Sequence, residues 1–185
     1  AIGDGSADDT AAFVAAIAAA GAQDTIYVPK GTYNITSELL FSSDRFRFVG
    51  DGINISILQF APTANGNLIK VSNGASINFQ STIKGFTFTS QDTTYTKVAL
   101  DIWDVSEMQI HDISIAGANG YWRGAGSIGL RTQGREFTTV RNLTIFAEKP
   151  LVIADNPNST IDVDHWHFED LYLASYSGAP NPLIT

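Results

Sequence analysis

The stretches that decide the fold of this chain are IKGFTF (83–88), IHDISI (110–115), VRNLTI (140–145) and FEDLYL (168–173), offset by 27, 30 and 28 residues. Each copy has an apolar and a polar residue, then Gly, Asp or Asn, then an apolar, polar, apolar run. This pattern is typical of a tight bend that leads into a short strand with alternating sides. The repeat length predicts that each copy is one coil of a solenoid.

A second and weaker series supplies another strand to each coil. Its members are apolar at their first and third residues and occupy positions 69–71, 100–102, 128–130 and 151–153. Two strands and several turns in about 28 residues, without helical periodicity, fit a parallel β-helix better than a sandwich or a leucine-rich repeat. We therefore predict an all-β fold, a right-handed single-stranded parallel β-helix, with about six coils over residues 25–185.

Residues 8–20 (DDTAAFVAAIAAA) carry the one strong helical signal. Acidic residues stand at the start of this segment, alanines fill it, and Gly21 can end it. Phe13 and Ile17 lie four residues apart and share a narrow apolar stripe with Val14. We predict a helix that covers the open amino-terminal end of the solenoid, where unpaired strand edges otherwise invite aggregation.

The composition argues against several classes of partner. The 185 residues are 44% apolar and 16% charged, with a net charge of −8. Neutralising phosphates requires a surplus of Lys and Arg, so we expect no nucleic-acid partner. No run approaches 18 consecutive apolar residues, so we expect no membrane insertion. The sequence has no cysteine, which excludes disulfides and thiolate metal sites.

Three motifs follow one another near the amino terminus: GDGSADDTAAF (3–13), IYVPKGTYNI (26–35) and FRFVGDG (46–52). Together they resemble the amino-terminal signature of the pectate-lyase-like β-helix superfamily, particularly its branch of phage tailspikes and capsular polysaccharide depolymerases. The resemblance implies a homotrimeric protein of the virion tail. It also implies that the full-length protein binds and depolymerises a bacterial surface polysaccharide, either capsule or O-antigen. We expect no cofactor.

Two other functions fit the same residues. The chain could belong to a non-catalytic trimeric stalk that binds glycan or has a structural role, or to a secreted pectinase-like or glucanase-like enzyme. The glycan, and the choice between hydrolysis and β-elimination, stay open. The chain starts inside the first motif, and its last residues, 182–184, repeat the pattern of 150–152. We therefore expect residues 1–185 to be a single β-helix domain cut at both ends, with the main catalytic residues of the enzyme outside it.

Within the chain, one pair of carboxylates is a weak catalytic candidate. Equivalent positions on neighbouring coils lie about 4.8 Å apart, and the coil alignment puts Asp104 and Asp155 at one position, two coils apart. Their expected separation of roughly 9.6 Å approaches the carboxyl spacing of about 6.5–9.5 Å in inverting glycoside hydrolases. The more common role of such residues is to bond neighbouring backbone in a turn.

Aromatic and basic side chains give the candidate substrate contacts. The coil alignment places Trp103 next to Arg131 on the outer surface, as a cation–π pair. A glycine-rich insertion at 116–127 interrupts the repeat, and loops on a rigid scaffold often carry function. Flat rings cover the apolar face of a sugar while Arg binds its carboxylate or hydroxyls, and the tip of the insertion is Tyr121, Trp122 and Arg123. Alternatively, Trp122 packs onto the coil or into a subunit contact.

The same alignment predicts two further outward columns, one of Lys70, Asp101, Gly129 and Val152 and one of Lys84, His111, Arg141 and Glu169. In the second column we expect Arg141 to pair with Glu169. The alternative for that column is a basic patch for an acidic sugar. The residues that follow it, at 85, 112, 142 and 170, are expected to form left-handed bends.

Two acidic clusters are weak metal candidates. Asp4, Asp8 and Asp9 lie close together in sequence, but the spacing lacks the twelve-residue calcium loop and the helix start uses these residues. The run from Asp162 to Glu169 alternates along a strand and so divides between two faces. We therefore assign no metal ligand.

Overall fold

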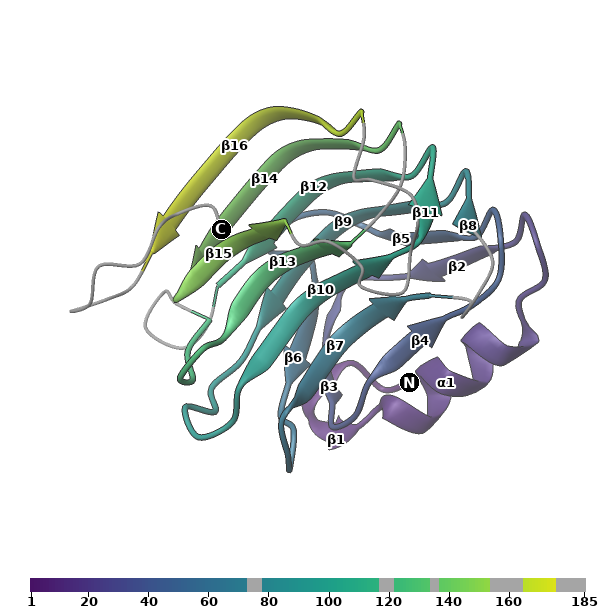
Figure 1. Cartoon of the computed structure of the whole chain (residues 1–185). Coiled ribbons are helices and arrows are strands. Elements are labelled where there is room, and N and C mark those ends of the chain that lie inside the picture. The colour runs from purple at the N-terminus through teal and green to yellow at the C-terminus, as the bar shows by residue number, and fades with distance from the viewer. Residues whose placement is uncertain (73–77, 117–121, 134–136, 154–164, 176–185) are drawn as a thin grey trace.

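The computed structural model describes residues 1–72, 78–116, 122–133, 137–153 and 165–175. These residues form a parallel β-solenoid with one short helix at its amino-terminal end (Figure 1). The fold class predicted from the repeated pattern is confirmed. The named strands pair in parallel with a strand of the neighbouring turn, so side chains at equal register positions stack along the solenoid.

Two sheets run along the solenoid. The first sheet contains, in order, β1 (Asp4–Asp8), β3 (Gly31–Ile35), β6 (Ser56–Phe60), β9 (Thr82–Thr89), β12 (Gln109–Ile115), β14 (Thr139–Ala147) and β16 (His167–Ser175), together with β2 (Thr25–Val28) and β5 (Arg47–Gly50). The second sheet contains β4 (Leu39–Phe41), β7 (Gly66–Val71), β10 (Lys97–Trp103), β13 (Ile128–Gln133) and β15 (Lys149–Ile153). A short third sheet pairs β8 (Asn78–Phe79) with β11 (Val105–Ser106).

The solenoid has about five turns, because each turn contributes one strand to the second sheet. The range 25–185, for which about six coils are expected, includes residues outside the described part of the chain, so that count stays a prediction. The strand β16 pairs with β14 and is the last member of the first sheet. Residues 176–185 lie outside the described part of the chain.

The first sheet is folded along a line of left-handed residues. The first half of β9 pairs with β5, whereas its second half pairs with β6. The bend between the halves recurs in β12, β14 and β16, and the residues with positive φ at this line are Gly85 (78°), Asp112 (57°), Asn142 (47°) and Asp170 (51°). The predicted bends are therefore confirmed. Glycine is required at position 85, because a Cβ there would lie 2.5 Å from the carbonyl oxygen of Gly50.

The interior is filled by apolar side chains stacked from turn to turn. At the amino-terminal end, the Phe48 ring stacks on Phe86, with ring centroids 4.5 Å apart. Phe41 stacks on Phe46 at 4.6 Å, and all four rings are buried. Each fully buried ring contributes about 1.5–3 kcal/mol relative to an exposed one. Buried side chains at equal register positions, such as Phe86, Ile113 and Leu143, explain why the apolar pattern of the sequence repeats once per turn.

The helix α1 (Thr10–Ala19) lies at the amino-terminal end of the solenoid (Figure 1). It is shorter than the predicted 8–20, because residues Asp4–Asp8 form β1. Phe13 is buried and meets Tyr33 edge-on, with ring centroids 5.3 Å apart, and Ile17 packs against the same core. Val14 was expected on this face but is 46% exposed, because it lies one position away from the buried stripe.

None of the helices in the described ranges has the length and apolar character needed to cross a membrane.

Candidate functional site

The outward face of the second sheet carries a column of alternating charges. Lys70 of β7 pairs in register with Asp101 of β10, and Asp101 pairs with Arg131 of β13. Because in-register parallel strands lie about 4.8 Å apart, these three side chains stack on one another. The column continues to Val152 of β15.

The predicted version of this column was wrong by two residues in one strand. It placed Gly129 beside Asp101, where the structure has Arg131. A shift of two residues keeps the same side of a strand inward, so alternation alone does not exclude it. In the correct register Thr132 takes an inward position and is fully buried. The prediction was based on apolar residues at inward positions, so it disfavoured a register with a polar residue there.

Arg131 and Asp101 form a two-pronged ion pair. Arg131 donates from Nε to one carboxylate oxygen of Asp101 and from an Nη atom to the other, both at 2.7 Å. The Asp101 side chain is 1% exposed and that of Arg131 is 27% exposed. These hydrogen bonds raise the pKa of Arg131 above its ordinary value, although burial acts in the opposite direction. The pair holds the guanidinium in a fixed plane.

The ring of Trp103, at the end of β10, lies between two cations. Lys70 Nζ is 5.5 Å from the ring centroid, and the guanidinium carbon of Arg131 is 5.9 Å from it. The predicted contact of Trp103 with Arg131 is confirmed by this distance. The two residues are not in the same register column, however, because the partner of Trp103 on β13 is Gln133.

Of the two catalytic candidates, Asp104 and Asp155, the structure describes only Asp104. Asp104 directly follows β10, is buried and has a left-handed backbone with φ of 48°. Its position at the corner between β10 and β11 fits the turn role. Asp155 lies outside the described residues, so the separation of the two carboxylates stays a prediction.

The residues expected at the tip of the insertion are spread over different environments. Tyr121 lies outside the described residues. Trp122 is fully buried and stacks parallel on Phe60, with centroids 6.2 Å apart, and its Nε1 donates to the carbonyl oxygen of Lys97 at 3.4 Å. This placement corresponds to the alternative in which the ring packs onto the coil. Arg123 is partly buried, and its carbonyl oxygen accepts a hydrogen bond from the Ser127 hydroxyl.

Trp122 and Trp103 do not share one site. Trp122 contacts Lys97, the first residue of β10, whereas Trp103 is the last residue of that strand. Six residues of a strand span roughly 20 Å. Of the five predicted binding residues, the structure therefore brings Trp103 and Arg131 together. The structure adds Lys70 and Asp101 to this group. The alignment had placed both on the outer face, but only the correct register puts them in one column with Arg131.

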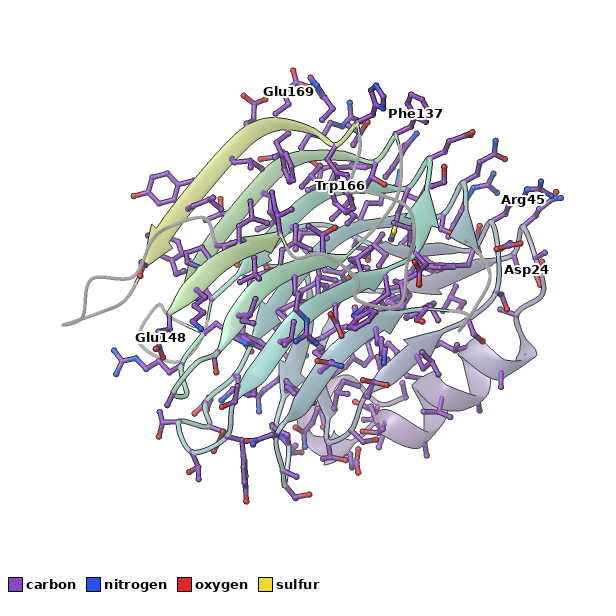
Figure 2. All side chains as sticks on the ribbon, viewed as in Figure 1. Asp24, Arg45, Phe137, Glu148, Trp166 and Glu169 are labelled. Atoms are coloured by element: carbon purple, nitrogen blue, oxygen red, sulfur yellow. The ribbon has the colours of Figure 1, made fainter. Side chains whose placement is uncertain are left out.

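The second predicted column is in register as expected. Lys84, His111, Arg141 and Glu169 pair in this order across β9, β12, β14 and β16. His111 Nδ1 lies 2.7 Å from the Asp112 carboxylate, which also accepts a hydrogen bond from Asn142. The Asn142 amide, and then His111, hold the pKa of Asp112 below its usual range. Glu169 projects from the outer side of β16 (Figure 2), and its ion pair with Arg141 stays a prediction.

The amino-terminal carboxylates are engaged by backbone groups. Asp4 accepts hydrogen bonds from the amides of Ser6 and Ala7 at 2.9 Å, and the amide of Ala7, then that of Ser6, lowers its pKa. Asp8 accepts from the Thr10 amide at the start of α1. Asp9 instead accepts from the amides of residues 2 and 3. These bonds fix the chain as it enters the helix.

Residues 1–146 match the family described as rhamnogalacturonase A/epimerase, pectate lyase-like. The chain belongs to this family. The match covers the cap, the strands from β1 to β13 and all of β14 but its last residue, and the pectate-lyase-like part of the resemblance is thereby confirmed.

This pectate-lyase-like chain is also similar in fold to a solved phage protein. The protein described as ORF18 of Geobacillus virus E2 superimposes with a TM-score of 0.66 at 14% identity, over 91% of this chain. The chain spans 38% of the length of that phage protein. No curated protein sequence matches the chain.

Lys70, Asp101, Trp103 and Arg131 form one surface of this pectate-lyase-like chain, which we call the charged face. The chemistry of this surface is that of binding. Lys70 and Arg131 supply donors for a carboxylate or for sugar hydroxyls, and Trp103 supplies a flat ring between them. Asp101 uses both oxygens on Arg131, so it orients the guanidinium and is not poised as a general acid or base.

Proposed function

We propose that the chain is part of a phage tailspike-type protein that binds and depolymerises a bacterial surface polysaccharide, capsule or O-antigen. The observation that carries the proposal is the charged face, where Trp103 lies between Lys70 and Arg131 on a rigid parallel sheet. Such a surface matches a saccharide with acidic groups, because ring and cations can be engaged together. The family and the fold of the phage protein support the same reading.

Assembly and location belong to the same proposal. A tailspike-type protein is a homotrimer on the virion tail, and we propose this state for the full-length protein. Light scattering of the full-length protein would give three times the mass of one chain. A stable monomer of the full-length protein would contradict the proposal.

The experiment is incubation of the full-length protein with surface polysaccharides from a panel of bacteria. New reducing ends without an unsaturated product indicate hydrolysis, whereas ultraviolet absorbance of an unsaturated sugar indicates β-elimination. Asp104→Asn and Asp155→Asn are assayed alongside. Full cleavage by both variants would place catalysis on other residues, and loss of cleavage with retained binding in both would assign it to this pair.

One observation favours a non-catalytic glycan-binding or stalk module as the second candidate. The carboxylate at the centre of the charged face is neutralised by Arg131 and buried, which suits recognition more than proton transfer. Binding of a polysaccharide by the full-length protein with no products after long incubation would support this candidate over the enzyme.

The description of the family favours a third candidate, a secreted pectinase-like enzyme. That description names a rhamnogalacturonase. Plant pectic polysaccharides are therefore included in the same assay. Cleavage of pectic chains without cleavage of bacterial polysaccharides would replace the tailspike proposal.

A further inference from the structure

A second surface of the solenoid has a column of left-handed residues at one corner. The column has one residue per turn, two positions before β9, β12, β14 and β16, namely Gln80 (φ 52°), Glu107 (56°), Phe137 (54°) and His165 (52°). Gln, Glu and Phe are not the residue types that tolerate this conformation easily, whereas His adopts it more often.

A groove of about 360 Å³ runs beside this corner. One wall is the corner column, with Gln80, Glu107 and Phe137, and the other is the first outward position of the strands, with Thr82, Gln109 and Thr139. Buried Met108 lies beneath them. The volume falls within the range of about 300–1,000 Å³ of small-molecule sites.

The groups that line the groove are suited to a polyhydroxylated ligand. Two side-chain amides, two hydroxyls and one carboxylate face it, and each of these can donate to or accept from a sugar hydroxyl. Gln80 Nε2 donates to Glu107 Oε2 at 2.8 Å, which ties the side chains of neighbouring turns together. These two polar side chains are therefore already arranged before a ligand binds.

Phe137 adds an apolar platform at the rim of the groove. The ring is 56% exposed and points outward from the solenoid (Figure 2). One of its faces lies on the His165 imidazole, with centroids 4.9 Å apart and planes 13° apart. This stacking fixes the ring, and a rigid exposed ring among polar groups can cover the C–H face of a sugar.

We propose that this corner groove binds a neutral saccharide. The charged group among its described lining residues is Glu107, and a carboxylate disfavours a uronate or other anionic sugar. The next outward column, with Lys84 and Arg141, lies about two residues further along the strands, and its His111 is held by Asp112. The groove thus differs in charge from the cationic charged face on β7, β10 and β13.

Saccharide binding in the corner groove does not depend on cleavage of a polysaccharide. The corner groove and the charged face share no residue and lie on different sheets. Variants in the groove therefore report on the groove, whereas Trp103 and Arg131 variants report on the proposed function. A protein with two glycan-binding faces would hold a long chain at two places at once.

The test uses neutral oligosaccharides of glucose, galactose and mannose, with matched uronate oligosaccharides, and measures affinity by calorimetry on the whole chain. We expect neutral binding that Phe137→Ala weakens about tenfold or more. The matched control is Tyr172→Ala, because Tyr172 is equally exposed at 59% but lies beyond the bend of β16. We expect that control to keep the affinity and both variants to keep the melting temperature.

Glu107→Gln tests the specificity. It keeps the shape and the contact with Gln80 but removes the charge, so we expect neutral binding to persist and uronate binding to rise by about threefold or more. No neutral oligosaccharide binding, equal loss in Phe137→Ala and Tyr172→Ala, or preference of the unmodified chain for uronates would each overturn the proposal. Loss of neutral binding in Trp103→Leu with retention in Phe137→Ala would assign the sugar to the charged face and overturn it as well.

Discussion

Lys97 Nζ lies 2.9 Å from Oδ2 of Asp92, and the Lys97 side chain has no exposed surface. The ammonium also donates to the carbonyl oxygens of Asp92 at 2.8 Å and Tyr95 at 3.1 Å. Gly124 of the next turn packs against this group, since a Cβ there would lie 2.1 Å from the Tyr95 oxygen. One buried cation therefore joins the loop before β10 to the segment before β13.

This pair predicts a loss of stability in acid. Burial alone would raise the pKa of Asp92, but the Lys97 hydrogen bond and the Tyr95 and Thr94 amides lower it to about 2. A folded pKa below the unfolded one stabilises the protein above about pH 4, and the effect is lost as the pH falls toward 2. We expect a contribution of about 2 kcal/mol.

Urea unfolding of the unmodified chain and of Asp92→Asn measures this contribution. The difference between their free energies of unfolding should shrink as the pH falls from about 6 to about 2. A difference that stays constant over this range would show that the Asp92 charge does not stabilise the fold.

The helix cap makes a second prediction. Phe13→Asp places a carboxylate against Tyr33 and Phe48, where Phe13 is 4% exposed. We expect the free energy of unfolding to fall by several kcal/mol, on the order of 3–5 kcal/mol. Val14→Asp is the matched control, because Val14 is the next residue of α1 and is 46% exposed. Equal melting temperatures for both variants would mean that α1 does not cover the core.

The part of the fold that could be predicted has one physical marker. In the first sheet, β9, β12, β14 and β16 each contain a residue that tolerates a left-handed bend, and this residue fixes the phase of the inward positions. The column of Lys84, His111, Arg141 and Glu169 was therefore aligned correctly. The strands of the second sheet have no such marker. A register shifted by two residues in β13 therefore still placed apolar residues at the inward positions, and the pattern could not exclude it.

The choice between the two predicted placements of Trp122 could not be made from the sequence, for a different reason. Its flanking glycines indicate an exposed loop, but the ring fills a space beside Phe60 that strands of other turns create. Long-range packing of this kind leaves no periodic signal near the residue. The charged face was half predicted, because Trp103 and Arg131 stand out by residue type while Asp101 gains its role only from register.

The burial of Trp122 makes a third prediction, on stability. Trp122→Ala removes a fully buried ring and the stack on Phe60, so we expect a loss of about 3–5 kcal/mol. Thermal unfolding measures it. Trp122→Phe keeps most of the volume and should recover more than half of the loss. An unchanged melting temperature in Trp122→Ala would instead place the ring at the surface, as a sugar contact requires.

The ion pair of the charged face makes a fourth prediction. Arg131→Ala leaves the Asp101 carboxylate buried without its partner, which should cost about 3–5 kcal/mol. Replacing both residues, in Asp101→Val with Arg131→Met, should restore most of that stability, because no buried charge is left unpaired. Urea unfolding of the single and double variants decides the matter, and a double variant as unstable as Arg131→Ala would contradict the account.

Trp103 makes the last prediction, which concerns binding alone. Its ring lies between Lys70 and Arg131 and is partly exposed, so Trp103→Leu removes the flat surface while keeping an apolar side chain on β10. We expect affinity for the cognate polysaccharide of the full-length protein to fall by about 2 kcal/mol, the size of an anchoring interface residue. The double variant Asp101→Val with Arg131→Met should also bind weakly although it is stable, because the guanidinium is gone. If both variants bind as the unmodified protein does, the charged face supports the fold and another surface holds the glycan.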